Sequence, residues 1–127
     1  MVMSLEHFEL HGNPDYTFSY CVRAGDLLYT AHHGAWTYEG APSELDINEQ
    51  TEYTFRNLEK TLAAAGASLD DIAQTTVYLR SKEDFKGMKD ATRGIFKKYP
   101  ARMTVFTDFL NDNCLIMIEA VAYKLKN

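Results

Sequence analysis

The residue of this chain best suited to bind a small organic acid is Arg102. It directly follows Pro100 and Ala101 and opens a predicted strand, so it lies where two elements meet. The end of an element can project a guanidinium into a crevice, and arginine can bind a carboxylate through two parallel hydrogen bonds. An ordinary surface ion pair, worth about 0–1 kcal/mol, explains the same position equally well at this point.

A basic segment precedes Arg102. Residues 80–102 carry eight Lys and Arg against three Asp and Glu, although the whole chain has a net charge of −5. Five basic residues recur at helical intervals of three and four: Lys82, Lys86, Lys89, Arg93 and Lys97. We favour a solvated helix face over a track for anions or RNA, and Lys89 lies nearest the apolar edge. The acidic total argues against a dedicated nucleic-acid binder.

The histidines and cysteines form no metal or disulfide pattern. His32 and His33 are adjacent, so in a strand they point to opposite faces and are poorly placed to share a metal ion. Cys21 and Cys114 are far apart and belong to no Cys-x-x-Cys pair. We expect both to be small buried hydrophobes, with a nucleophilic thiol as the weaker alternative.

Length and composition describe a single domain spanning residues 1–127. The chain is 46% hydrophobic and 13% aromatic, which excludes a disordered protein. No run of about 18 apolar residues occurs, and the first residues lack the basic and apolar regions of a secretory signal. With only two cysteines as well, we expect a reduced cytoplasmic protein that does not contact membranes.

Apolar periodicity predicts the element order βββαβαββ. One helix is predicted to begin at Ser43, in a capping box over 43–46, and to stop at Gly66. A second is predicted to begin at Ser81 and to end at Pro100. The predicted strands span 5–10, 16–22, 27–32, 75–79, 103–109 and 115–123. This order is typical of an α+β fold, with one mixed sheet and two helices on one of its faces.

The last predicted strand, 115–123, is largely apolar on both of its alternating faces. Strands with this pattern are buried on both sides, whereas two helices can cover only one face of the sheet. We therefore expect another copy of the chain to cover the other face, which makes the protein an obligate homo-oligomer.

Several short segments resemble a known family over about residues 16–124. They are VRAGDLLY at 22–29, NLEKTLAAAGA at 57–67, DI at 71–72, TTVYL at 75–79, PAR at 100–102 and IEA at 118–120. Together they resemble the RidA/YjgF family of reactive-intermediate imine deaminases, also called the endoribonuclease L-PSP family. The resemblance implies a chorismate-mutase-like fold and a homotrimer with inward-facing sheets and ligand clefts between subunits. It also implies hydrolysis of enamines and imines to 2-oxo acids and ammonia, without metal or cofactor.

The resemblance also assigns residues to the cleft, with Arg102 as the ligand of the substrate carboxylate. The other cleft residues that it implies are Phe18, Gly34, Lys89, Thr104 and Met117. Met117 stands where hydrolytic members carry a glutamate that positions water, and Phe18 stands where they carry a tyrosine. A thioether cannot orient water as a carboxylate does, so the water-handling half of the site is altered.

Three functions remain open. A deaminase would need His32, His33 or Glu119 to handle the water. A trimeric binder or sensor would hold a carboxylate-bearing metabolite at Arg102 without converting it. An RNA-cleaving translation inhibitor is weakly supported by the basic segment, but the net charge and the lack of interleaved stacking aromatics oppose it. Lys89 near Arg102 would suggest a dicarboxylate or an otherwise larger anion.

Overall fold

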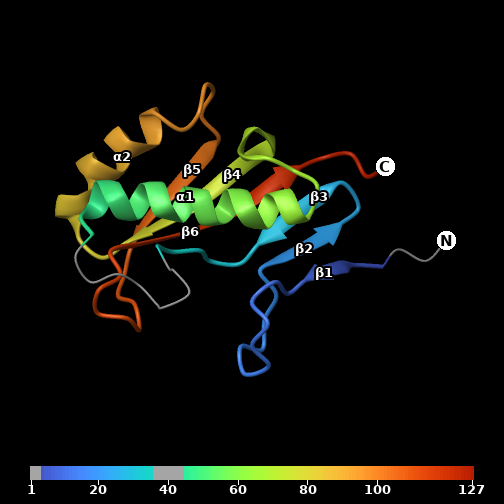
Figure 1. Ribbon diagram of the computed structural model, residues 1–127. Helices are drawn as coiled ribbons and strands as arrows, with labels where there is room; N and C mark the ends of the chain where they lie inside the picture. The colour runs from blue at the N-terminus through green and yellow to red at the C-terminus, as the bar shows by residue number, and fades with distance from the viewer. Residues whose placement is uncertain (1–3, 36–44) are drawn as a thin grey trace.

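The computed structural model describes residues 4–35 and 45–127, which form one six-stranded sheet with two helices packed on one face (Figure 1). The sheet order is β1-β2-β3-β6-β4-β5, and every neighbouring pair is antiparallel except the parallel pair of β4 and β5. The predicted element order and the mixed sheet are confirmed. The strands are β1 (Glu6–Phe8), β2 (Cys21–Ala24), β3 (Leu27–Thr30), β4 (Ile72–Leu79), β5 (Ala101–Phe106) and β6 (Ile116–Tyr123). The helices are α1 (Ile47–Ala64) and α2 (Phe85–Arg93), with 3-10 turns at Leu69–Asp71 and Lys82–Asp84.

Helix α1 begins later than predicted. Its N-cap is Asp46, whose carboxylate accepts a hydrogen bond from the backbone N–H of Glu49, while the Glu49 side chain accepts one from Asp46. This capping box satisfies free N–H groups of the first turn, so the predicted start at Ser43 is wrong; Ser43 itself lies outside the described residues. Beyond the C-terminus of the helix, Gly66 has a φ of +86°, a conformation that glycine adopts without strain.

Helix α2 ends at Arg93, and the prediction that it continues to Pro100 is wrong. The chain leaves the helix at Gly94, and this turn allows Phe96 to be buried in the core. Its ring packs edge to face against Phe55 of α1, with 5.2 Å between the centroids. Tertiary packing thus ends the helix before its apolar periodicity does.

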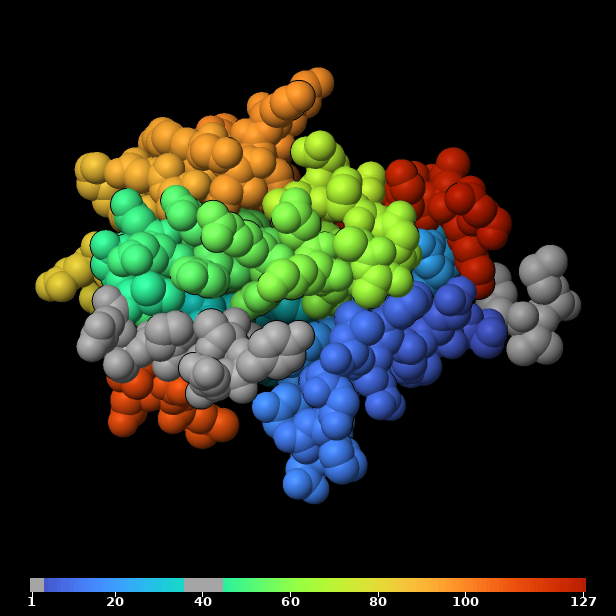
Figure 2. Space-filling model, viewed as in Figure 1, coloured from blue at the N-terminus to red at the C-terminus, as the bar shows by residue number. Residues whose placement is uncertain are grey.

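The first predicted strands are also shorter in the structure. The strand expected over 5–10 ends at Phe8 and the one expected over 16–22 begins only at Cys21, because Leu10 and Thr17 have positive φ angles that a strand cannot contain. The segment between them projects from the body of the molecule (Figure 2). The hairpin of β2 and β3 turns at Gly25 and Asp26, as the sequence predicts.

Alternation along β6 divides the sheet into a helix-covered face and an open face. The residues from Ile116 to Ala122 with even numbers are buried under the helices, whereas Met117, Glu119 and Val121 are only half-buried. Tyr29, Met103 and Tyr123 are exposed apolar residues of the same open face. Within the described residues, none of the helices is both long and apolar enough to cross a membrane.

Gly87 is predicted to be essential for the contact between α1 and α2. A Cβ at this position would come within 2.5 Å of Ile47 Cγ2 and 2.6 Å of Asn48 Oδ1. Gly87→Ala should therefore lower the free energy of unfolding by about 1–3 kcal/mol, although alanine has the better helix propensity. Gly94→Ala is the control, because the nearest contact there is 3.9 Å away. Equal stability of the two variants in urea denaturation would contradict the packing argument.

Candidate functional site

Arg102 lines a cavity of about 160 Å³ between α2 and the parallel strands β4 and β5. In the register of these strands Arg102 lies beside Thr75 and Thr104 beside Val77, so both side chains share the helix-covered face. The apolar part of the lining includes Phe55, Val77 and Pro100. Arg102 is exposed in the single chain, lines this cavity, and has no acidic side chain of the described residues within salt-bridge distance.

Lys89 lines the same cavity from the side of α2. Its Nζ lies 4.7 Å from the centroid of the Phe85 ring, and Arg102 Cζ lies 5.7 Å from the same centroid. Within residues 4–35 and 45–127, neither Lys89 nor Arg102 is within salt-bridge distance of a carboxylate. The structure thus places both predicted cations beside one aromatic ring and on the lining of one cavity.

The other basic residues that recur at helical intervals before Arg102 have different surroundings. Lys86 Nζ lies 2.8 Å from an Asp90 carboxylate oxygen, and Arg93 Nε lies 3.7 Å from the other oxygen. Lys86 is largely exposed, as expected for a solvated helix face. Lys82 and Lys97 lie outside α2 altogether, so the five basic residues do not form one continuous surface of a helix.

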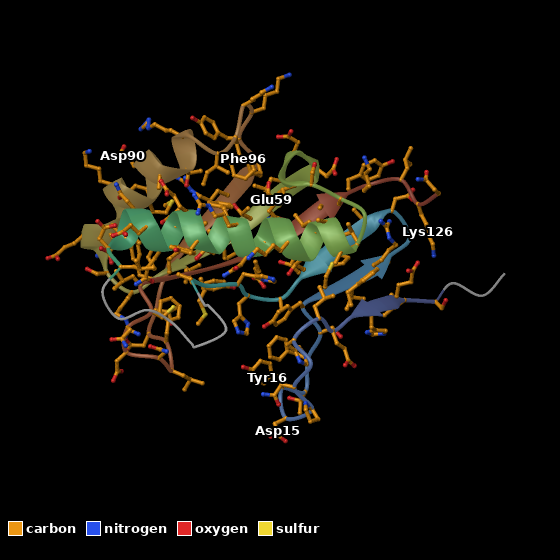
Figure 3. The ribbon with its side chains drawn as sticks, in the orientation of Figure 1. Asp15, Tyr16, Glu59, Asp90, Phe96 and Lys126 are labelled. Carbon is orange, nitrogen blue, oxygen red and sulfur yellow. The ribbon has the colours of Figure 1, made fainter. Side chains whose placement is uncertain are left out.

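Phe18 and His32 lie together at the other side of the molecule. Their ring centroids are 5.4 Å apart, and the Phe18 ring stacks on Tyr16 at 5.6 Å. Figure 3 shows Tyr16 in the projecting segment before β2, well away from Asp90 on α2. Because β5 and the β1–β2 pair form opposite edges of the sheet, the Phe18 group cannot reach the Arg102 cavity of its own chain.

His11 organises this aromatic group and is not among the predicted site residues. The His11 ring lies 4.9–5.5 Å from the rings of Tyr16, Phe18 and Tyr20. Its Nδ1 accepts a hydrogen bond from the backbone N–H of Asn13, and its Nε2 bonds the carbonyl of Phe18 at 2.6 Å. The only available signal was the alternation of aromatic residues at 16, 18 and 20, which lie in the predicted strand 16–22.

His33 is buried and hydrogen-bonded within its own chain. This position does not support the water-handling role that we expected for it. The residue is 2% exposed; its Nδ1 bonds the Ala31 carbonyl at 2.8 Å and its Nε2 bonds Thr61 Oγ1 at 2.7 Å. Gly34 is also buried, and its carbonyl accepts a hydrogen bond from Asn57 Nδ2. Its predicted contact with substrate has no support here.

We expect His33 to make stability depend on pH. Burial lowers its pKa below the ordinary 6.5, so the unfolded state binds more protons than the folded state in mildly acidic solution. The free energy of unfolding should therefore fall by up to about 1.4 kcal/mol per pH unit below about pH 6.5. Urea denaturation between about pH 7 and 5 measures this, and the His33→Gln variant should lack that part of the slope. Identical slopes in both proteins would contradict the assignment.

Met117 and Glu119 lie on the open face of the sheet. The Tyr78 hydroxyl donates a 2.7 Å hydrogen bond to Glu119 Oε1, and this bond raises the pKa of Tyr78. Arg102 lies on the opposite face, so these residues cannot serve the Arg102 cavity of their own chain. A single chain therefore holds the predicted site in separate groups: Arg102 with Lys89 and Thr104, Phe18 with His32, and Met117 with Glu119.

The cysteines are inert in this structure. Cys21 and Cys114 are both buried, and burial raises the pKa of the Cys21 thiol to about 11. Because the thiolate is the reactive form, we expect neither cysteine to react with a thiol reagent at about pH 8 until urea unfolds the chain. Fast labelling of the native protein would contradict this.

Across residues 4–35 and 45–127, no three His, Cys, Asp or Glu side chains gather as a metal site would require.

Comparison with known proteins identifies the fold and then the family. A solved structure of a YjgF-family protein from Mycobacterium tuberculosis superposes with a TM-score of 0.82 at 26% identity, over 94% of this chain and 99% of that one. The sheet and its two helices are thus those of the YjgF-type proteins. The model of the family described as Endoribonuclease L-PSP matches residues 12–124, and the chain belongs to this family.

Two relatives illustrate the range of the family. A RutC family protein of Pyrococcus horikoshii is 36% identical over 111 residues, which cover 84% of this chain and 86% of that protein. A protein of Dermatophagoides farinae named 2-iminobutanoate/2-iminopropanoate deaminase is 28% identical over 108 residues, 82% of this chain and 83% of the relative. The resemblance that the sequence motifs indicated is confirmed.

Proposed function

We propose that the protein hydrolyses reactive 2-imino acids, and their enamine forms, to 2-oxo acids and ammonia. Water adds to the imine carbon, and the resulting carbinolamine loses ammonia to leave the carbonyl. The observation that carries the proposal is that Arg102 lines a cavity and has no carboxylate within salt-bridge distance among the described residues. Membership in a family that includes a named imine deaminase supports the choice of reaction.

In this proposal Arg102 binds the substrate carboxylate and fixes the position of the imine carbon. Holding the imine and a water molecule in one geometry lowers the entropic part of the barrier. His32 and Glu119 are the candidates for orienting that water, because His33 is buried and Met117 offers only a thioether. His32 is exposed at the end of β3, and Glu119 faces the open side of the sheet.

The proposal includes a homotrimer in which neighbouring copies complete the site. One chain keeps Arg102 apart from both water-handling candidates, so the site needs residues from a second copy. The exposed Tyr29, Met103 and Tyr123 give the open face the apolar character of a subunit contact. Light scattering at micromolar concentration should therefore give three times the chain mass of 14.5 kDa. A monomeric mass would contradict the shared site.

The reaction is tested by making 2-iminobutanoate in the cuvette with an amino acid oxidase and catalase. Release of 2-oxobutanoate is then followed with and without the protein, since imines also hydrolyse spontaneously. A rate above background that is proportional to protein concentration supports the proposal. A rate equal to background at every concentration would overturn it.

A second function is favoured by the altered water-handling groups. With Met117 in place of a carboxylate and His33 buried, the protein could bind a 2-oxo acid at Arg102 without turnover. In that case 2-oxo acids would raise the melting temperature, because a ligand that binds only the folded state stabilises it. No rate above background, together with stabilisation that is lost in Arg102→Ala, would select this function.

A further inference from the structure

The cavity beside Arg102 has more positive charge than one carboxylate needs. Lys89, Arg93 and Arg102 all line it, and no Asp or Glu does so among the described residues. Arg93 has Asp90 as a partner, but Lys89 and Arg102 have no carboxylate within salt-bridge distance in this part of the chain. Two cations that share a small cavity repel each other, and a ligand with two negative charges would remove that repulsion.

The two cations also approach the cavity from different elements. Arg102 comes from β5, whereas Lys89 comes from α2 and is half-buried. Both stand by the Phe85 ring, with Nζ at 4.7 Å and Cζ at 5.7 Å from its centroid. Phe55 and Val77 add to the same lining an apolar surface that suits a short carbon chain. A linear acid with a carboxylate at each end matches this arrangement.

We propose that the ligand is a dicarboxylate, namely the 2-imino acid of an acidic amino acid and the dicarboxylic 2-oxo acid that it becomes. Arg102 binds the carboxylate next to the imine carbon, and Lys89 binds the distal carboxylate. This assignment rests on the proposed function, because it assumes that Arg102 binds the substrate carboxylate. Lys89 is thus the residue that determines specificity, and a reaction that oxidises the Cα–N bond of acidic amino acids must supply the substrate.

The test compares two stable acids by isothermal titration calorimetry with the full chain. One is 2-oxoglutarate, and the other is 5-methyl-2-oxohexanoate, in which an isopropyl group of similar shape replaces the distal carboxylate. We expect the wild type to bind 2-oxoglutarate about tenfold more tightly, the contribution of one hydrogen bond to a charged group. The preference should shrink in high salt, since screening weakens a half-exposed pair.

Two variants locate the preference. Lys89→Gln should bring the ratio of the two affinities close to one, whereas Lys86→Gln should leave it at the wild-type value. Lys86 is the matched control because it lies on the same helix but points to solvent and pairs with Asp90. Melting temperatures within the error of the wild type establish that both variants are folded.

The outcomes separate this inference from the proposed function. Equal binding of both acids by the wild type, or a preference that survives in Lys89→Gln, overturns the dicarboxylate assignment and leaves Arg102 as a carboxylate ligand. Binding of neither acid, or unchanged binding of both by Arg102→Ala, overturns the proposed function and the assignment with it.

Discussion

Arg102→Ala should reduce kcat/KM for 2-iminobutanoate hydrolysis by about 100-fold, the largest effect that we expect from one substitution. The variant loses the bidentate, charge-assisted hydrogen bonds to the substrate carboxylate. Their loss corresponds to about 2–3 kcal/mol of transition-state binding free energy. Initial rates of 2-oxobutanoate release measure this directly. Arg102→Lys should recover only part of the loss, because an ammonium group cannot form the parallel pair of bonds.

Stability provides the control for this prediction. Arg102 is exposed and contributes only its position over Phe85, so removing it should change the free energy of unfolding by less than about 0.5 kcal/mol. Lys98→Ala, another exposed cation that does not line the cavity, should leave the rate unchanged. Equal rates in Arg102→Ala and the wild type would remove Arg102 from the site.

Arg23→Met should lower the free energy of unfolding by about 2–4 kcal/mol, the largest stability effect that we expect. Arg23 is 6% exposed, and its guanidinium donates hydrogen bonds to the carbonyls of Gly25, Ala65 and Lys124 at 2.9–3.2 Å. It thereby connects the β2–β3 turn, the end of α1 and the C-terminal segment. Water can replace the bonds to Gly25 and Lys124, but the Ala65 bond is buried and would remain unmade.

Urea denaturation followed by circular dichroism measures the effect, with Arg56→Met as the matched control. Arg56 is exposed on α1 and, within residues 4–35 and 45–127, makes only a 5.8 Å cation–π contact with Tyr53, so its removal should cost less than about 0.5 kcal/mol. If both variants lost the same stability, the hydrogen bonds of Arg23 would not be the reason.

The elements were predictable where local pattern and tertiary packing agree. The order of strands and helices, the stop at Gly66 and the Gly25–Asp26 turn all follow from periodicity and turn chemistry. The predicted boundaries fail where packing overrides the pattern. Helix α2 stops early so that Phe96 enters the core, and the projecting segment contains the positive φ angles of Leu10 and Thr17 instead of a strand.

The candidate site was predictable in part. The Pro100–Ala101 break before Arg102 and the position of Lys89 nearest the apolar edge predicted two cations near a crevice, and in the structure both residues line one cavity. The burial of His33 was not predictable, because its partner Thr61 lies on a helix far along the sequence. Whether a strand residue faces the helices or the open side depends on register, which separates Glu119 from Arg102.

Subunit mixing tests most directly whether Arg102 acts in a site shared by two copies. Chains carrying Arg102→Ala are unfolded together with equal amounts of chains carrying His32→Ala and Glu119→Gln, refolded, and assayed for imine hydrolysis. Each parent alone should be nearly inactive, while random trimers should regain about a quarter of the wild-type activity, because that fraction of shared sites receives both intact halves. A mixture no more active than its parents, beside an active refolded wild type, would contradict the account.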